Sequence, residues 1–98
     1  MNDLDGSTDE FVIFMTNFYA LYPEFESRDL YLSGESYAGK FVPRYTYQLL
    51  EENTSLGYSK FNVSAALIGD PFVSPLTQRT HMHVLAEALN ILNESNLA

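Results

Sequence analysis

The sequence predicts an α/β fold whose sheet is parallel and incomplete. Helical and strand-like patterns alternate in the order helix, strand, helix, strand, helix, which indicates a parallel β-α-β crossover. A tight turn of small residues joins the first strand directly to the following helix. Only two strands are expected in the 98 residues, whereas a parallel sheet needs more strands and cover on both faces.

The first helix is predicted from the spacing of its apolar side chains. Ser7 and Glu10 have the spacing of a capping box, in which each side chain accepts a hydrogen bond from the backbone N–H of the other residue. The apolar residues that follow recur every three or four positions: Phe11, Phe14, Met15, Phe18 and Leu21. We interpret this stripe as core packing, which is a commoner meaning of such spacing than a ligand surface. Pro23 is expected to end the helix.

The strands and the helix between them are predicted from short apolar runs and their flanks. A strand is expected over residues 29–33, and a buried strand over residues 63–68. A helix is expected to start at Tyr37 and to continue to about Asn53. Pro43 is expected either to kink this helix or to open a fresh one.

The rest of the chain is expected to be loop and one more helix. Turn-forming residues occupy 54–62 and 69–75. An amphipathic helix is predicted over residues 77–92, with an apolar side formed by Val84, Leu85, Ala88, Leu89 and Leu92. His81 and His83 lie two residues apart and so on different faces of this helix, which disfavours a metal pair. We interpret both as surface or helix-start residues.

The composition excludes several classes of partner and site. There are 13 acidic and 5 basic side chains, a net charge of −8, so nucleic acid and anionic membranes would be repelled. The chain has no cysteine, and therefore neither a disulfide nor a thiolate metal site. We expect no metal and no cofactor. No membrane-spanning segment is expected either, because no apolar run is long enough to cross a bilayer.

Three N-glycosylation sequons point to the secretory pathway. They begin at Asn53, Asn62 and Asn93. The first residues are acidic and contain no apolar stretch, so they do not form a signal peptide. We therefore expect a lysosomal, vacuolar or extracellular protein whose true N-terminus lies upstream of Met1.

The turn after the first strand has the form of a nucleophile elbow around Ser36. The general pattern has a glycine two positions on either side of the serine. Gly34 fits this pattern, and the other position is Ala38, with Gly39 one place later. At such a corner the serine hydroxyl is exposed, and the next backbone N–H is free to face a substrate oxyanion. The alternative interpretation is a glycine-rich loop with an ordinary serine.

The residues around this turn resemble the active-serine segment of the serine carboxypeptidases, an α/β-hydrolase family. The resemblance is strongest over residues 34–43, which read GESYAGKFVP. It runs from about Asp9 to the C-terminus, and includes residues 22–25 before the first strand and 66–71 in and after the second. Most relatives have Gly-Asn-Gly where this chain has Gly-Asp-Pro at 69–71. Because of the Gly-Asp pair, we expect the vitellogenic-like branch of the family to be the most similar.

The resemblance implies roles for the residues of the turn. Ser36 would be the nucleophile. Tyr37 would offer its backbone N–H to the oxyanion hole, and its ring would line the pocket for the penultimate side chain of a peptide. Glu35 would bind the terminal carboxylate of the peptide, in its protonated form and within a hydrogen-bonded group, which explains an acidic pH optimum. The alternative for Glu35 is an exposed glutamate favoured by the helix dipole.

Other parts of the family's site are not expected in this chain. The resemblance places the acid and the base downstream of Ala98, and the glycine-rich oxyanion loop upstream of Met1. Residues 1–98 are therefore interpreted as a central fragment of a serine carboxypeptidase catalytic domain, with a partial α/β-hydrolase fold. On its own this fragment is expected to be inactive and marginally stable.

The predicted function is that of a serine carboxypeptidase that releases C-terminal residues from peptides through an acyl-enzyme on Ser36. Two alternatives stay open. One is an acyltransferase or esterase that uses the same serine, and the other is a non-catalytic protein that uses the fold for binding. The sequence makes no prediction of the oligomeric state.

Overall fold

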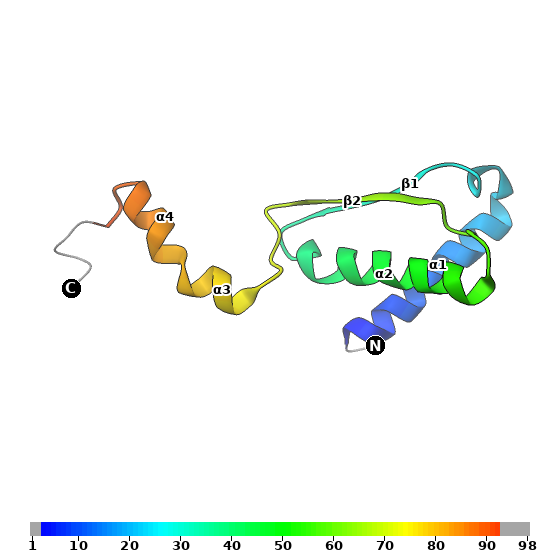
Figure 1. Ribbon diagram of the computed structural model, residues 1–98, viewed down its shortest axis with the longest axis horizontal. Helices are drawn as coiled ribbons and strands as arrows, with labels where there is room; N and C mark the ends of the chain where they lie inside the picture. The colour runs from blue at the N-terminus through cyan, green and yellow to red at the C-terminus, as the bar shows by residue number, and fades with distance from the viewer. Residues whose placement is uncertain (1–2, 93–98) are drawn as a thin grey trace.

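The computed structural model describes residues 3–92 and shows alternating helices and strands (Figure 1). In chain order the elements are helix α1 (Leu4–Leu21), the short 3₁₀ helix η1 (Pro23–Phe25), strand β1 (Leu30–Glu35), helix α2 (Ala38–Leu56), strand β2 (Val63–Gly69), helix α3 (Pro75–Thr80) and helix α4 (Met82–Ala88). None of these helices is long and apolar enough to cross a membrane.

The two strands form a parallel pair, as the sequence predicts. Leu32 lies opposite Ala66, and Glu35 lies opposite Gly69 at the carboxyl ends of both strands. Helix α2 connects the strands and covers one face of the sheet (Figure 1). The expectation of a buried second strand is wrong, because every residue of β2 is half-buried or exposed. Within residues 3–92 no further element covers the other face, so nothing buries that side of the strand.

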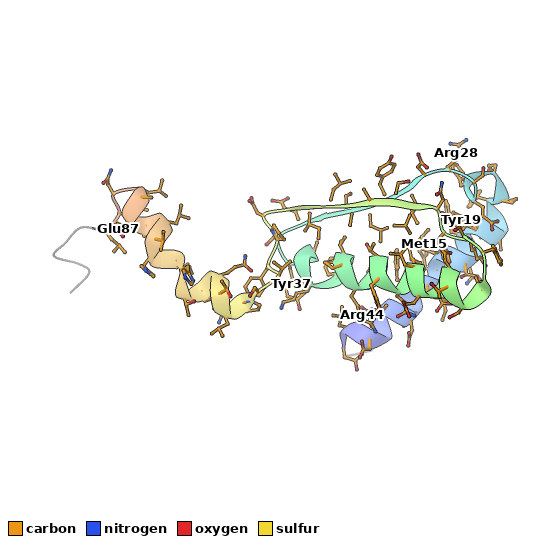
Figure 2. The ribbon with its side chains drawn as sticks, in the orientation of Figure 1. Met15, Tyr19, Arg28, Tyr37, Arg44 and Glu87 are labelled. Carbon is orange, nitrogen blue, oxygen red and sulfur yellow. The ribbon has the colours of Figure 1, made fainter. Side chains whose placement is uncertain are left out.

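The core lies where α2 packs against the sheet and against α1 (Figure 2). Leu49 and Phe61 are no more than 2% exposed, and they are its best-buried apolar side chains. The other buried apolar residues are Met15, Tyr19, Leu32, Ala38 and Val42. The predicted apolar stripe of the first helix contributes only in part. Met15 is buried, whereas Phe14 is 59% and Leu21 is 75% exposed.

Helix α1 begins earlier than the sequence pattern indicates, and the predicted capping box is wrong. The helix starts at Leu4, because the side chain of Asp3 caps it by accepting a hydrogen bond of 2.7 Å from the N–H of Gly6. Ser7 therefore lies inside the first turns, where its hydroxyl contacts the carbonyl of Leu4 and, at 2.9 Å, the hydroxyl of Tyr45 on α2.

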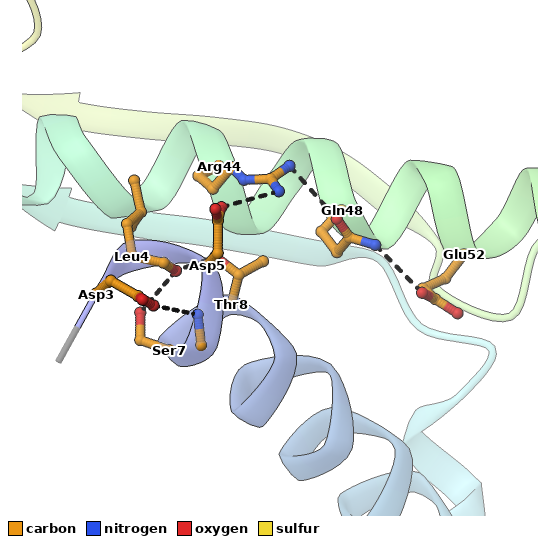
Figure 3. Close-up of polar contacts among 9 residues, drawn as sticks. Asp3, Leu4, Asp5, Ser7, Thr8, Arg44, Gln48 and Glu52 are labelled. Atoms are coloured by element: carbon orange, nitrogen blue, oxygen red, sulfur yellow. Dashed lines mark hydrogen bonds and ion pairs between the residues drawn. The ribbon is translucent and has the colours of Figure 1, made fainter. Parts of the chain in front are cut away.

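Polar contacts also join α1 to α2 (Figure 3). Arg44 on α2 donates to the carboxylate of Asp5 on α1 at 3.2 Å and to Gln48 at 3.4 Å. Gln48 in turn donates to Glu52 at 3.3 Å. These groups are partly exposed, so we expect each pair to contribute little stability.

Helix α2 is continuous and longer than predicted. Pro43 lies inside it and does not open a separate helix. The helix runs to Leu56, three residues beyond the expected end at Asn53. It stops at Gly57, whose φ of 75° is a left-handed conformation that costs glycine little.

The predicted last helix is wrong, because two short helices, α3 and α4, take its place. They meet at His81, whose φ of −109° and ψ of 8° are not helical. The apolar side chains expected to pack on this segment are exposed: Val84 52%, Leu85 63% and Leu89 60%. Figure 1 shows both helices extending away from the sheet, so no packing selects one long helix.

Candidate active site

Ser36 lies at the corner where β1 ends and α2 is about to begin. Its φ is 56°, in the left-handed region that a residue with a side chain rarely adopts. Such a conformation costs on the order of 1–3 kcal/mol and persists only where the surroundings enforce it. The predicted sharp corner is therefore present. The strand is longer than expected, however, because β1 continues to Glu35 and pairs with β2 along its whole length.

Backbone hydrogen bonds hold Ser36 on both sides. Its N–H donates to the carbonyl of Gly69 at 2.9 Å. Its carbonyl accepts from the N–H of Phe72 at 2.8 Å and from the N–H of Gly39 at 3.1 Å. Two of these three partners are the last residue of β2 and a residue just after it, so the turn between β1 and α2 is fastened to the end of the neighbouring strand.

The small residues of the turn are required by different contacts. A Cβ on Gly34 would overlap the Cβ of Ala38 and would lie 3.2 Å from Val42. These two positions therefore let strand and helix approach closely, as a nucleophile elbow requires. Gly39 serves another purpose, because a Cβ there would lie 2.7 Å from the backbone nitrogen of Phe72.

Tyr37 precedes the first helical residue of α2. Among residues 3–92, no hydrogen-bond partner is found for its backbone N–H. Its side chain is 65% exposed and lies at the end of α2 near the ends of the strands (Figure 2). The ring borders a hollow of about 640 Å³, which is also lined by Asp3, Leu4, Ser7, Glu10, Lys40, Phe41 and Tyr45.

Glu35 ends strand β1 and is exposed. Its Cγ would lie 3.8 Å from a Cβ built on Gly69, so the side chain passes over the end of β2. In the described part of the chain no hydrogen bond is found for its carboxylate. The hydrogen-bonded group expected around Glu35 is thus not formed by these residues alone.

The two histidines lie on the α3–α4 segment. His81 is in the break between the helices, so the expectation that a regular helix separates the two rings onto different faces is wrong. The ring centroids of His81 and His83 are 6.4 Å apart. Nδ1 of His81 lies 2.8 Å from the carbonyl of Thr77. Within residues 3–92 no group of three or more His, Cys, Asp or Glu side chains is placed to hold a metal ion.

The sequons differ in their surroundings. The side-chain amide of Asn53 joins helix α2 to Phe61, which lies two residues before β2. It donates to the carbonyl of Phe61 at 2.8 Å and accepts from the N–H of the same residue at 2.9 Å. Asn62 is exposed and donates to Asp29 at 2.9 Å. Asn93 lies outside the described residues.

Phe72 is not among the site residues predicted from the sequence, although its N–H donates a hydrogen bond to the Ser36 carbonyl. No sequence signal identifies this contact, since it involves a backbone atom 36 positions away. Asp70 has a φ of 40° and is the other strained residue of the corner. Its position before Pro71, in a turn-rich stretch, is the signal that could have pointed to a bend here.

Comparison with known proteins identifies the family. The model of the serine carboxypeptidase family matches residues 1–98. The chain is 41% identical over 78 residues to the pheromone-processing carboxypeptidase KEX1 of Chaetomium globosum. That alignment covers 80% of this chain and 12% of the relative. It is 36% identical over 85 residues to the probable serine carboxypeptidase CPVL of Dictyostelium discoideum, covering 87% of this chain and 17% of the relative.

A solved structure agrees with this result. The crystal structure of the prohormone-processing carboxypeptidase KEX1(delta)p from Saccharomyces cerevisiae superposes with a TM-score of 0.91 at 32% sequence identity. The match covers 98% of this chain and 20% of that one. The chain thus spans between about an eighth and a fifth of the length of these relatives, and its helices and parallel strands form a partial α/β fold of their type. The chain belongs to the serine carboxypeptidase family.

Proposed function

We propose that this protein acts as a serine carboxypeptidase and that Ser36 is its nucleophile. One observation carries the proposal. Ser36 is held at φ 56° on a strand-to-helix corner, and no partner is found among the described residues for the next backbone N–H, that of Tyr37. This arrangement exposes a hydroxyl and leaves an amide beside it for an oxyanion.

The reaction would proceed in two steps. The Ser36 oxygen attacks the carbonyl carbon of the last peptide bond while a general base removes the hydroxyl proton. The N–H of Tyr37 donates to the oxyanion that forms. The C–N bond then breaks, the proton passes to the departing amine, and the peptide remains as an ester on Ser36. Water hydrolyses this ester and restores the hydroxyl.

The general base and its orienting acid are not identified among the described residues. A serine hydroxyl is a weak nucleophile without a base. We therefore expect the 98-residue chain alone to be inactive towards peptides.

Glu35 and Tyr37 are proposed to bind substrate. Glu35 is exposed at the carboxyl end of β1, one residue from Ser36, where the terminal carboxylate of a bound peptide would come close. A carboxyl group binds a carboxylate well only when one of the two is protonated, so this contact favours acidic pH. The exposed ring of Tyr37 is proposed to contact the penultimate side chain.

Peptide C-termini are thus the proposed substrates, and the secretory pathway is the proposed location. The names of relatives support the substrate class, since they describe pheromone-processing and prohormone-processing carboxypeptidases. The N-glycosylation sequons support the location. Of the two sequons within residues 3–92, Asn62 is exposed and is the better-placed candidate for a glycan. Asn53 lies in a helix with its amide engaged.

The proposal is tested in a chimera in which residues 1–98 replace the matching fifth of the Saccharomyces cerevisiae enzyme. We expect this chimera to release the last residue of a blocked dipeptide, and the Ser36→Ala chimera to lose this activity. Ser33→Ala is the matched control, because Ser33 is an exposed serine of β1 and is not at the corner. Full turnover by the Ser36→Ala chimera would refute the proposed nucleophile.

The same chimera separates the two alternatives. An esterase or acyltransferase would act on a blocked amino-acid ester and leave the peptide intact. A non-catalytic binding protein would give no covalent product with a fluorophosphonate probe, whereas the proposed enzyme would be labelled at Ser36.

A further inference from the structure

We infer that the segment Gly69–Phe72, here called the clamp, aims the proposed oxyanion donor, and that Gly39 is the positioning residue that allows the clamp to close. The inference rests on the proposed role of Ser36. It adds the part of the molecule that sets the direction of the Tyr37 N–H.

A single planar peptide joins Ser36 to Tyr37. The carbonyl of Ser36 and the N–H of Tyr37 belong to the same peptide unit, which is planar and trans, so the two groups point in opposite directions. Whatever fixes the Ser36 carbonyl therefore fixes the Tyr37 N–H. The N–H of Phe72 donates to this carbonyl at 2.8 Å, from the side of the clamp.

The clamp also controls the preceding peptide. The carbonyl of Gly69 accepts the N–H of Ser36 at 2.9 Å, so both peptide units of the serine are held by the same segment. Ser36 and Asp70 both have positive φ, at 56° and 40°. Each strained residue thus lies within a hydrogen-bonded ring that joins the corner to the clamp, which explains how the strain persists.

A second hydrogen bond strengthens the effect. The N–H of Gly39 also donates to the Ser36 carbonyl, at 3.1 Å. A carbonyl that accepts two hydrogen bonds is polarised, and its peptide N–H becomes a better donor. The arrangement therefore both aims and strengthens the N–H proposed to meet the oxyanion.

Gly39 makes this closure possible. A Cβ at this position would lie 2.7 Å from the nitrogen, 2.9 Å from the carbonyl carbon and 3.0 Å from the oxygen of Phe72. These are backbone atoms, so they cannot rotate away as a side-chain end can. Any side chain at position 39 would push the Phe72 N–H away from the Ser36 carbonyl and release the peptide that carries the Tyr37 N–H.

The first test uses the 98-residue chain and does not depend on activity. By NMR we expect the Phe72 amide to be protected from hydrogen exchange and Ser36 to show the coupling of a positive φ. Gly39→Ala should lose both signals. Gly57→Ala is the matched control. Its φ of 75° makes alanine costly there too, but its Cβ position is open and lies at the other end of α2 from the corner, so both signals should remain. If Gly39→Ala keeps both signals, the clamp is refuted.

The second test measures kinetics in the chimera and covers the case in which a variant of the short chain does not fold. An oxyanion contact is made mainly in the transition state, so its loss lowers kcat and leaves KM almost unchanged. We expect kcat per folded molecule to fall about 10- to 100-fold in Gly39→Ala, since removal of one such donor costs roughly 10²–10³. Gly57→Ala should keep kcat.

The outcomes separate this inference from the proposed function. An inactive Ser36→Ala chimera together with a fully active Gly39→Ala chimera would refute the clamp alone. An active Ser36→Ala chimera would refute the nucleophile, and the NMR result would then still decide whether the clamp holds the corner.

Discussion

Gly34 of strand β1 and Ala38 of helix α2 lie so close that a methyl group on the glycine would overlap the methyl group of the alanine. The position of a Cβ is set by the backbone, so an added methyl group at position 34 could not rotate away from Ala38. The distance between strand and helix at the corner is thus set by one missing Cβ.

We predict that Gly34→Ala destabilises the chain by about 2–3 kcal/mol, at the upper part of the range for overpacking. The urea midpoint of unfolding measures this loss. The double variant Gly34→Ala with Ala38→Gly should recover part of it, because the second change removes the overlapping methyl group. If the single variant unfolds at the wild-type midpoint, the close contact is not present in solution.

A second prediction concerns the strain at Ser36. A left-handed conformation costs a residue with a Cβ about 1–2 kcal/mol, and costs glycine almost nothing. We therefore expect Ser36→Gly to be more stable than Ser36→Ala by about 1 kcal/mol. At Ser33, in the extended strand, the order should reverse, with glycine less stable than alanine. Equal midpoints for the two variants at position 36 would contradict the strained geometry.

A third prediction concerns the amide of Asn53. Asn53→Ala removes both hydrogen bonds to the backbone of Phe61, a residue only 2% exposed. We expect a loss of about 1–3 kcal/mol, because a buried backbone group is left without a partner. Asn62→Ala is the control, since it too removes a sequon but breaks only an exposed contact. It should change stability by less than about 0.5 kcal/mol.

A fourth prediction concerns alkaline pH. Burial raises the pKa of Tyr19 above its ordinary value of 10.0, and the nearby negative charge of Glu26 raises it further. Below pH 10 the phenol is neutral in both folded and unfolded chains. As the pH rises from 10 towards the higher folded pKa, only the unfolded chain ionises, so stability falls.

Urea unfolding measured at intervals between pH 8 and pH 11.5 checks this effect. Tyr19→Phe should show a smaller loss of stability above pH 10 than the wild type. Tyr58→Phe serves as the control, because Tyr58 is 56% exposed, and it should keep the wild-type slope. The same slope in wild type and Tyr19→Phe would count against the burial of this phenol.

Local sequence patterns were sufficient to predict the corner and the crossover. Small residues around Ser36 specify a tight turn, and two apolar runs separated by a helix specify parallel strands. The family resemblance followed from the same stretch. The local pattern gave a wrong start for α1, because Asp3 rather than Ser7 caps the helix.

The remaining features depend on contacts that are distant in sequence. The apolar spacing of residues 77–92 predicts one helix, but nothing packs on that face in the described chain, and the helix breaks at His81. The apolar composition of strand β2 predicts a buried strand, whereas only one of its faces is covered. The bond from Phe72 to Ser36 uses backbone atoms, which every residue type except proline supplies equally.

The backbone bond between Phe72 and Ser36 limits how this region can change over evolutionary time. Main-chain groups fasten the serine, so this hydrogen bond allows any residue except proline at position 72, whereas it does not allow a change in the spacing between the end of the second strand and that position. Substitutions there should accumulate readily, while a one-residue insertion or deletion would bring the wrong amide to the serine and should be eliminated.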